Sequence, residues 1–179
     1  QPPALAGILF AAIVSDTLYF RSPTATLFDE DTAKRLAVQA GIRDAEAFAM
    51  EVLRHGSAIG TMPVQDIVRN DIKEFDFGEH RITVSQINIM DRQQALERLA
   101  DLQTALEDFR RQEGCDLSLL MITDILGEAT DLLAAGSPQT QLVHAFGEAA
   151  AAGCYHLPGV LSRKKQIIPP LTEAFRKLD

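Results

Sequence analysis

The sequence predicts an α/β fold, in which a mixed β-sheet of about five strands is flanked by helices and preceded by an isolated N-terminal helix. Three observations support this class. Residues 72–77 and 81–90 alternate between apolar and polar side chains, which is typical of a β-hairpin. Residues 115–125 form a nearly continuous apolar run, as in a central strand covered on both faces. Residues 92–113 carry leucines at the spacing of a long amphipathic helix.

The first part of the chain is expected to be helical. Residues 4–20 are the most apolar segment, but they are shorter than the ~20 residues that span a bilayer, and they include Asp16. No positively charged region precedes them, so they do not resemble a secretory signal. We therefore expect a buried helix and no membrane contact. A turn-rich connector over residues 21–26 follows, and it is the one plausible domain boundary.

Start and stop signals define the remaining elements. Thr26 and Asp44 are suited to cap two helices that end at Gly41 and Gly56, and a short helix follows Pro63. The sequence further predicts a strand over 130–137, a helix from Pro138 through Phe146, a short strand over 154–159, and a C-terminal helix begun by Pro169 and Pro170.

Charge and cysteine content restrict the function. The 179-residue chain has a formal net charge of −8, which argues against bulk nucleic-acid binding, so any anion binding must be local. Cys115 and Cys154 form no zinc-finger pattern. We expect two buried thiols in a cytoplasmic protein, with a disulfide between them as the alternative. No short catalytic motif occurs, and the four histidines are scattered singly, which favours surface or hydrogen-bonded histidines over metal ligands.

The densest positive charge lies in an unexpected place. Arg163, Lys164 and Lys165 stand between apolar segments, whereas solvated basic runs are usually embedded in polar sequence. A helix is disfavoured ahead of Pro169, so we expect a loop on which neighbouring cations converge. A guanidinium fork and an ammonium group suit phosphate oxygens. We therefore favour a phosphate clamp over a solvated basic turn.

Two further charged residues are candidates for a site. Asp16 lies near the end of the apolar helix, where a buried carboxylate would need a partner or a cation. An exposed acid at a helix end is the alternative. Lys73 lies on the first strand of the hairpin, on the side of Phe75 and Phe77. From this pattern alone, a solvated lysine that packs its stem on aromatic rings is the favoured interpretation.

Four segments, taken together and in this order, resemble one protein family: "AAIVSDTLYFRSPTAT", "DIKEFDF", "LLMITDIL" and "LPGVLSRKKQIIPPLTEAF". Over essentially its whole length the chain is similar to the C-terminal part of the family II inorganic pyrophosphatases, which are manganese-dependent phosphoesterases of the DHH type. The matches "SDTLYFRSPTAT" and "SRKKQ…PPLTEAF" are specific, whereas "DIKEF" is weaker when taken alone.

The resemblance implies a two-domain enzyme that hydrolyses pyrophosphate to two phosphates in the cleft between its domains. Residues 1–20 would be the terminal helix of an N-terminal DHH domain, and residues 21–26 the connector. Residues 27–179 would be the C-terminal domain, which closes over the site. The intact protein is expected to be a soluble homodimer.

Site residues follow from the same resemblance. Asp16 matches the last metal ligand, whereas Lys73, Arg163 and Lys164 match the cations that bind phosphate. Lys165 has no assigned role. The metal would be Mn²⁺, with Mg²⁺ or Co²⁺ as alternatives, and two or more ions would activate a water.

The chain departs from the family pattern in one large respect. It has no HxxxDxD and no DHH motif, which carry most of the metal ligands, and it begins at Gln1 close to the middle of an apolar helix. We therefore expect an N-terminal DHH domain upstream and little or no activity in this chain by itself. The alternatives are an exopolyphosphatase of the same superfamily and a non-catalytic anion-binding regulatory module.

Overall fold

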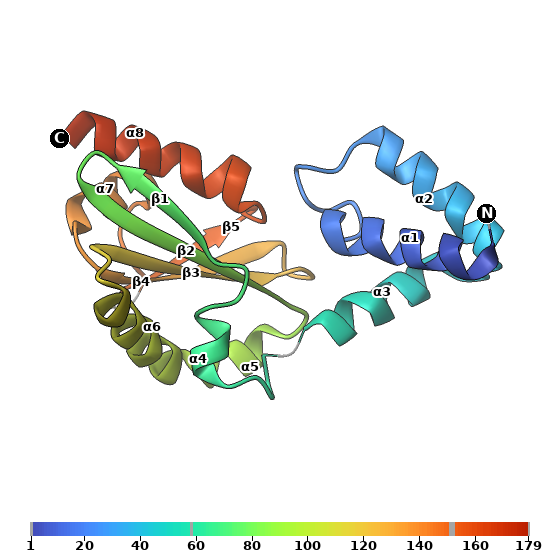
Figure 1. Cartoon of the computed structure of the whole chain (residues 1–179), viewed down its shortest axis with the longest axis horizontal. Helices are drawn as coiled ribbons and strands as arrows, with labels where there is room; N and C mark the ends of the chain where they lie inside the picture. The colour runs from blue at the N-terminus through green and yellow to red at the C-terminus, as the bar shows by residue number, and fades with distance from the viewer. Residues whose placement is uncertain (1, 58, 151–152, 179) are drawn as a thin grey trace. The chain divides into compact units, whose positions relative to one another are not determined.

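The structure is a computed structural model that describes residues 2–57, 59–150 and 153–178 (Figure 1). The chain divides into two compact units, Gln1–Ala58 and Ile59–Asp179, and each unit is treated separately. Within the described ranges, no helix combines the length and the apolar character that crossing a membrane requires.

The first unit contains the described helices α1 (Pro3–Thr17), α2 (Leu27–Ala40) and α3 (Ala45–Gly56). Helix α1 packs against both of the others, because its buried side chains recur at helical spacing. The ring of Phe10 on α1 lies 5.9 Å from that of Phe48 on α3, measured between centroids. The connector over residues 21–26 joins α1 to α2 within this unit.

The predicted caps of this unit are confirmed. The Thr26 hydroxyl accepts a hydrogen bond from the Asp29 amide, and the Asp29 carboxylate accepts one from the Thr26 amide, which is a capping box. The Asp44 carboxylate accepts from the Ala47 amide in the same way. Helix α1 ends earlier than expected, at Thr17, because three residues in left-handed conformation follow it.

The second unit is built on a five-stranded sheet, and this confirms the predicted mixed sheet and the α/β class. Its strands lie side by side in chain order: β1 (Lys73–Phe77), β2 (His80–Ile89), β3 (Leu117–Asp124), β4 (Ala129–Gly136) and β5 (Cys154–Pro158). Strands β2 and β3 are parallel, and the other neighbouring pairs are antiparallel. A two-residue turn at Gly78 and Glu79 closes the predicted hairpin.

Helices cover both faces of this sheet (Figure 1). One face packs on α4 (Val64–Ile67), α5 (Arg92–Leu96) and α6 (Leu99–Glu113); the other packs on α7 (Gln139–Phe146) and α8 (Ile168–Leu178). Strand β3 is buried on both faces, as its apolar run predicts: Leu120 and Ile122 face α6, while Leu119 and Met121 face α8. Cys115 and Cys154 are buried free thiols, so that prediction is confirmed.

The prediction of one continuous helix over residues 92–113 is wrong. The segment 92–113 forms two helices, α5 and α6, with a break at Glu97 and Arg98. The Arg98 guanidinium donates hydrogen bonds to the carbonyl oxygens of Ile59 and Met62, the latter at 2.8 Å. A tertiary contact of this kind leaves no trace in the apolar periodicity, which is why the sequence predicts one uninterrupted helix.

Candidate functional site

The basic segment is a helical turn and not the loop that the sequence predicts. Arg163–Ile167 form a π-helical turn, η1, which runs directly into α8. The hydroxyl of Ser162 accepts a hydrogen bond from the amide of Lys165 and so caps this turn. Pro169 does not prevent a helical turn ahead of it, because it lies in the first turn of α8, where a missing N–H group is tolerated.

The turn is fixed by what flanks it. The side chains of Leu161 and Ile167 are 5% and 0% exposed, so apolar anchors hold both ends of the basic segment in the core. Gln166 adds three hydrogen bonds: its Oε1 accepts from the amides of Leu161 and Ser162 at 2.9 and 3.0 Å, and its Nε2 donates to the Gly159 carbonyl at 2.7 Å. We did not predict this role of Gln166, since nothing in its local pattern indicates a buried partner.

Arg163 is anchored to the β1–β2 hairpin. Its Nη1 donates to the Val84 carbonyl at 2.9 Å and to the Asp71 carbonyl, and its Nη2 donates to the Asp71 carboxylate at 3.0 Å. Only 11% of the side chain remains exposed. The guanidinium is therefore held in one place and not left to move in solvent.

This contact brings Arg163 to the hairpin that carries Lys73. Val84, which accepts from Arg163, is the direct cross-strand partner of Lys73, and Asp71 precedes Lys73 by two residues. Lys73 is exposed at the start of the edge strand β1. The second unit thus gathers two of the predicted cations at one corner, although they lie far apart in the sequence.

Lys164 and Lys165 differ in their surroundings. Both are exposed on η1. Among the described residues, the ammonium groups of Lys73 and Lys164 have no hydrogen-bond or ion-pair partner, whereas Lys165 takes part in a further interaction. Lys165 also lines a hollow of about 380 Å³ together with His144 and Glu173. The corner near Lys73 therefore combines the fixed guanidinium of Arg163 with an exposed ammonium group that is available to a ligand, and Lys164, which follows Arg163 in the chain, is a second exposed cation.

Asp16 belongs to the first unit and is exposed in the last turn of α1. Three residues that follow shortly after it, Leu18, Tyr19 and Phe20, all have positive φ angles, of 50–67°. This conformation costs non-glycine residues roughly 1–2 kcal/mol each, and the chain turns sharply there. Across the part of the chain that the structure describes, no three potential ligands among His, Cys, Asp and Glu come together as a metal site.

A further charged cluster was not predicted. The Asp131 carboxylate on β4 is 3% exposed and binds Arg92 Nε at 2.6 Å and His156 Nδ1 at 2.7 Å. Burial by itself raises the pKa of Asp131, but the hydrogen bonds from Arg92 and His156 outweigh burial and hold that pKa below its usual range. His156 is therefore a hydrogen-bonded histidine, as we predicted. Asp131 could have been found from strand alternation, which places it on the same face as the buried Leu133.

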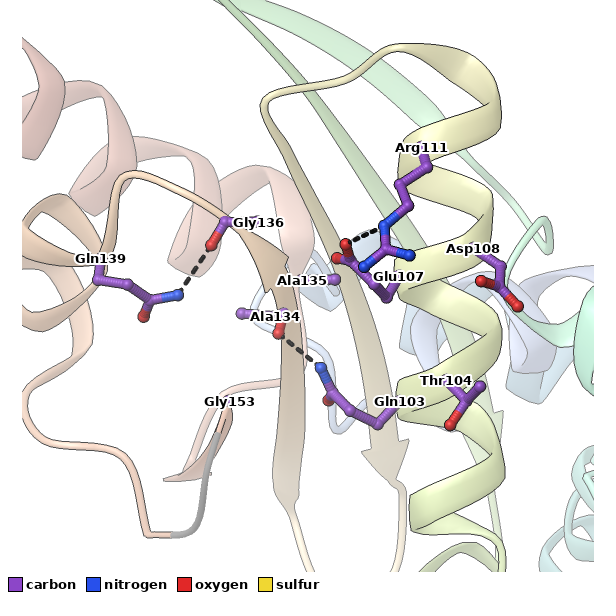
Figure 2. A pocket seen from close by; sticks show the side chains of 10 residues that line it. All are labelled: Gln103, Thr104, Glu107, Asp108, Arg111, Ala134, Ala135, Gly136, Gln139 and Gly153. Atoms are coloured by element: carbon purple, nitrogen blue, oxygen red, sulfur yellow. Dashed lines mark hydrogen bonds and ion pairs between the residues drawn. The ribbon is translucent and has the colours of Figure 1, made fainter.

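Another hollow, of about 520 Å³, lies between α6, the end of β4 and the start of α7 (Figure 2). Two glutamine side chains close its walls: Gln103 donates to the Ala134 carbonyl and Gln139 to the Gly136 carbonyl, each at 2.8 Å. None of the predicted phosphate-binding cations lines it. The candidate site is therefore the corner at Lys73, Arg163 and Lys164, and not this hollow.

Comparison with known proteins bears on the identity of the chain. The family model of the DHHA2 domain matches residues 50–174. The manganese-dependent inorganic pyrophosphatase of Methanocaldococcus jannaschii is 38% identical over 173 residues, which cover 97% of this chain and 56% of that protein. A protein of Lactobacillus delbrueckii subsp. bulgaricus, named as a probable manganese-dependent inorganic pyrophosphatase, is 38% identical over 176 residues with the same coverage.

A solved structure agrees with these relatives. The crystal structure of a candidate family II inorganic pyrophosphatase from Methanococcus jannaschii superposes with a TM-score of 0.88 at 38% identity, and the match covers 97% of this chain and 56% of that one. The chain thus spans about half the length of the curated relatives it matches. The resemblance to the C-terminal part of these enzymes is confirmed, and the chain belongs to the DHHA2 domain family.

Proposed function

We propose that this chain is the substrate-binding C-terminal part of a manganese-dependent inorganic pyrophosphatase, which hydrolyses pyrophosphate to two phosphates. The names of its relatives support this reaction. The observation that carries the proposal is the cationic corner of the second unit, where the guanidinium of Arg163 is fixed beside β1 and the ammonium groups of Lys73 and Lys164 have no partner among the described residues.

The three cations would bind the phosphate oxygens of the substrate. A body of net charge −8 repels polyanions at long range, so a compact positive corner restricts anion binding to this place. Hydrolysis transfers negative charge to the leaving phosphate, and cations fixed before the reaction stabilise that charge without reorganising. Arg163 is fixed in this sense, whereas Lys73 and Lys164 can adjust to the ligand.

Asp16 would provide one carboxylate ligand to manganese, for which its exposed position leaves it available. One ligand does not make a metal site, and the described residues do not by themselves fit a manganese centre. The other ligands would come from a DHH domain, with Mg²⁺ or Co²⁺ as alternative ions. The chemistry that this chain contributes is therefore binding and charge stabilisation by its cations.

The same proposal covers the organisation of the whole protein. Residues 1–20 would end a DHH domain and residues 21–26 would connect it to the clamping domain over 27–179, in a homodimeric cytoplasmic enzyme. The greater length of the relatives supports a further domain, and two buried free thiols suit a reducing compartment. Within the first unit, α2 and α3 pack on α1.

Titration of the chain with imidodiphosphate, a non-hydrolysable pyrophosphate analogue, tests the proposal. Replacing Lys73 or Lys164 with alanine should weaken binding, whereas Lys165→Ala, which removes the neighbouring charge, should leave it nearly unchanged. Equal affinities in all variants would contradict the clamp.

Phosphate release with Mn²⁺ should be negligible for the chain alone. In a protein that includes a DHH domain, preference for longer polyphosphates would instead support an exopolyphosphatase.

A further inference from the structure

Asp71 lies in the turn that leads into β1, two residues before Lys73. The ladder pair Lys73–Val84 is followed by two bonds between Asn70 and Gln86, of 3.0 Å to the Asn70 carbonyl and 2.7 Å from its side-chain amide. Between these contacts the β1 side has two residues where β2 has one, which is the arrangement of a β-bulge. Asp71 has a φ angle of 42°, in the left-handed region that aspartate tolerates better than most residues.

The bulge turns two acceptors of Asp71 toward Arg163. The backbone carbonyl of Asp71 binds Nη1, and its carboxylate binds Nη2 at 3.0 Å. Because the two terminal nitrogens bind the same residue, Asp71 occupies the end-on edge of the guanidinium. The second N–H of Nη1 is used by Val84. Three of the roughly five N–H donors of an arginine are thereby occupied.

The donors that remain form the other edge of Arg163. They are the Nε–H and the second N–H of Nη2, and they have no partner among the described residues. A side-on edge of this kind matches two oxygens of a phosphate. Asp71 thus fixes the guanidinium through one edge and leaves the second edge complete.

From this geometry we propose that Asp71 is a positioning residue that orients Arg163 so that its side-on edge receives a phosphate; the inference rests on the proposed function of Arg163. Orientation of Arg163 by Asp71 strengthens phosphate binding, whereas the negative charge of Asp71 weakens it, because a carboxylate near the site repels a phosphate. Removal of the side chain therefore weakens phosphate binding if orientation dominates, and strengthens it if charge dominates. The sign of the effect distinguishes the two.

Two substitutions that suit a positive φ angle allow the test. Asp71→Gly removes the carboxylate, and Asp71→Asn keeps an oxygen acceptor while it removes the charge. Asp76→Ala is the matched control, because Asp76 is an exposed acid of the adjoining strand β1 and makes no contact with Arg163. Circular dichroism establishes that each variant is folded before binding is measured.

Titration with imidodiphosphate should give an affinity about two- to tenfold lower for Asp71→Gly, the range for losing the order of one long side chain. Asp71→Asn should bind as tightly as the parent chain or more tightly, and Asp76→Ala should not weaken binding. If Asp71→Gly binds as well as Asp76→Ala, or more tightly than the parent, orientation by Asp71 is refuted.

A second measurement is independent of phosphate. The ¹⁵N relaxation of the Arg163 Nε–H signal, assigned by its disappearance in Arg163→Lys, should indicate an ordered side chain in the parent and in Asp71→Asn but a mobile one in Asp71→Gly. Unchanged order in Asp71→Gly would overturn the inference. If the parent chain binds no imidodiphosphate while this order is lost in Asp71→Gly, the proposed function fails and the positioning role of Asp71 stands.

Discussion

Arg92 and Asp131 form a two-pronged ion pair, in which Nε lies 2.6 Å from Oδ2 and Nη2 lies 2.9 Å from Oδ1. His156 adds a third contact, with Nδ1 at 2.7 Å from Oδ1. The carboxylate is buried, whereas the side chains of Arg92 and His156 are each 40% exposed. The ion pair therefore joins the start of α5 to the strand pair β4–β5 through a single buried acid.

Loss of Arg92 should destabilise the second unit. Arg92→Ala leaves the buried Asp131 carboxylate with only one partner, and breaking a buried pair costs about 3–5 kcal/mol, with the lower end expected because Arg92 is half-exposed. Urea denaturation measures the change. Arg111→Ala removes a mostly exposed arginine and should cost less than about 1 kcal/mol. Equal losses in the two variants would contradict the special role of the buried acid.

The same pair predicts a pH dependence. Because the pKa of Asp131 is lower in the folded than in the unfolded state, its contribution to stability is present above its unfolded pKa of about 4 and is lost as the pH falls through its folded pKa. Asp131→Asn lacks this titration. The difference in unfolding free energy between parent and variant should therefore shrink below about pH 4. A difference that grows on acidification would show that the sign is wrong.

Glu107 should titrate far below an ordinary glutamate. The hydrogen bond from Arg110 is the main cause that lowers the pKa of Glu107 to about 2. Burial opposes this effect, and the hydrogen bond from Arg111 lowers the pKa by a smaller amount. A ¹³C titration of the carboxyl measures this pKa, and Arg110→Ala should raise it more than Arg111→Ala. The effect on stability is small, no more than about 1 kcal/mol in Glu107→Gln, because solvent screens these i,i+3 and i,i+4 pairs.

Gly136 should not accept a side chain. Its φ angle is 101°, and a Cβ atom there would lie 2.1 Å from the Asp116 carbonyl oxygen, which belongs to the backbone and cannot move aside. Gly136→Ala should therefore cost about 3 kcal/mol or more. Gly114→Ala is the control, since Gly114 has a φ of 67° with no atom within 4 Å of the added Cβ, and only the left-handed backbone costs about 1–2 kcal/mol. Thermal unfolding of both variants compares the two, and similar losses would rule out the steric explanation.

The hydrogen bonds of Gln166 should matter both for the stability of the second unit and for its affinity for anions, because they hold the π-helical turn that carries Arg163 and Lys164. Gln166→Met keeps the length of the side chain but removes three hydrogen bonds, so two amides and one carbonyl lose their partner, at a cost of about 2 kcal/mol or more. The affinity for imidodiphosphate should fall with it. Gln39→Met, at an exposed position of α2, should change neither quantity. A stable Gln166→Met variant with normal affinity would mean that the apolar anchors alone hold the turn.

Much of the fold was predictable because its signals are local. Alternation predicts the hairpin, the continuous apolar run predicts β3 as the central strand, and Thr26 and Asp44 cap the helices that the sequence assigns to them. The break at Arg98 was not predictable, because it coincides with contacts to residues far away in the sequence. The π-helical turn at Arg163 was missed for a different reason: its hydrogen bonds to Ser162 and Gln166 are local, but Pro169 argues against a helical turn ahead of it.

The candidate site shows the same division. The sequence by itself determined which residues carry positive charge, that apolar residues bracket the basic segment, and which family the chain resembles. It could not show that Arg163 lies against the β1–β2 hairpin, because that contact arises only when the sheet places the hairpin beside the turn before α8. Only the tertiary structure decided that Asp71 and Val84 occupy part of the guanidinium and leave Lys73 and Lys164 available. The physical reason is that periodicity and capping energies act within a few residues, whereas the partners of a long side chain are chosen by strand order and burial.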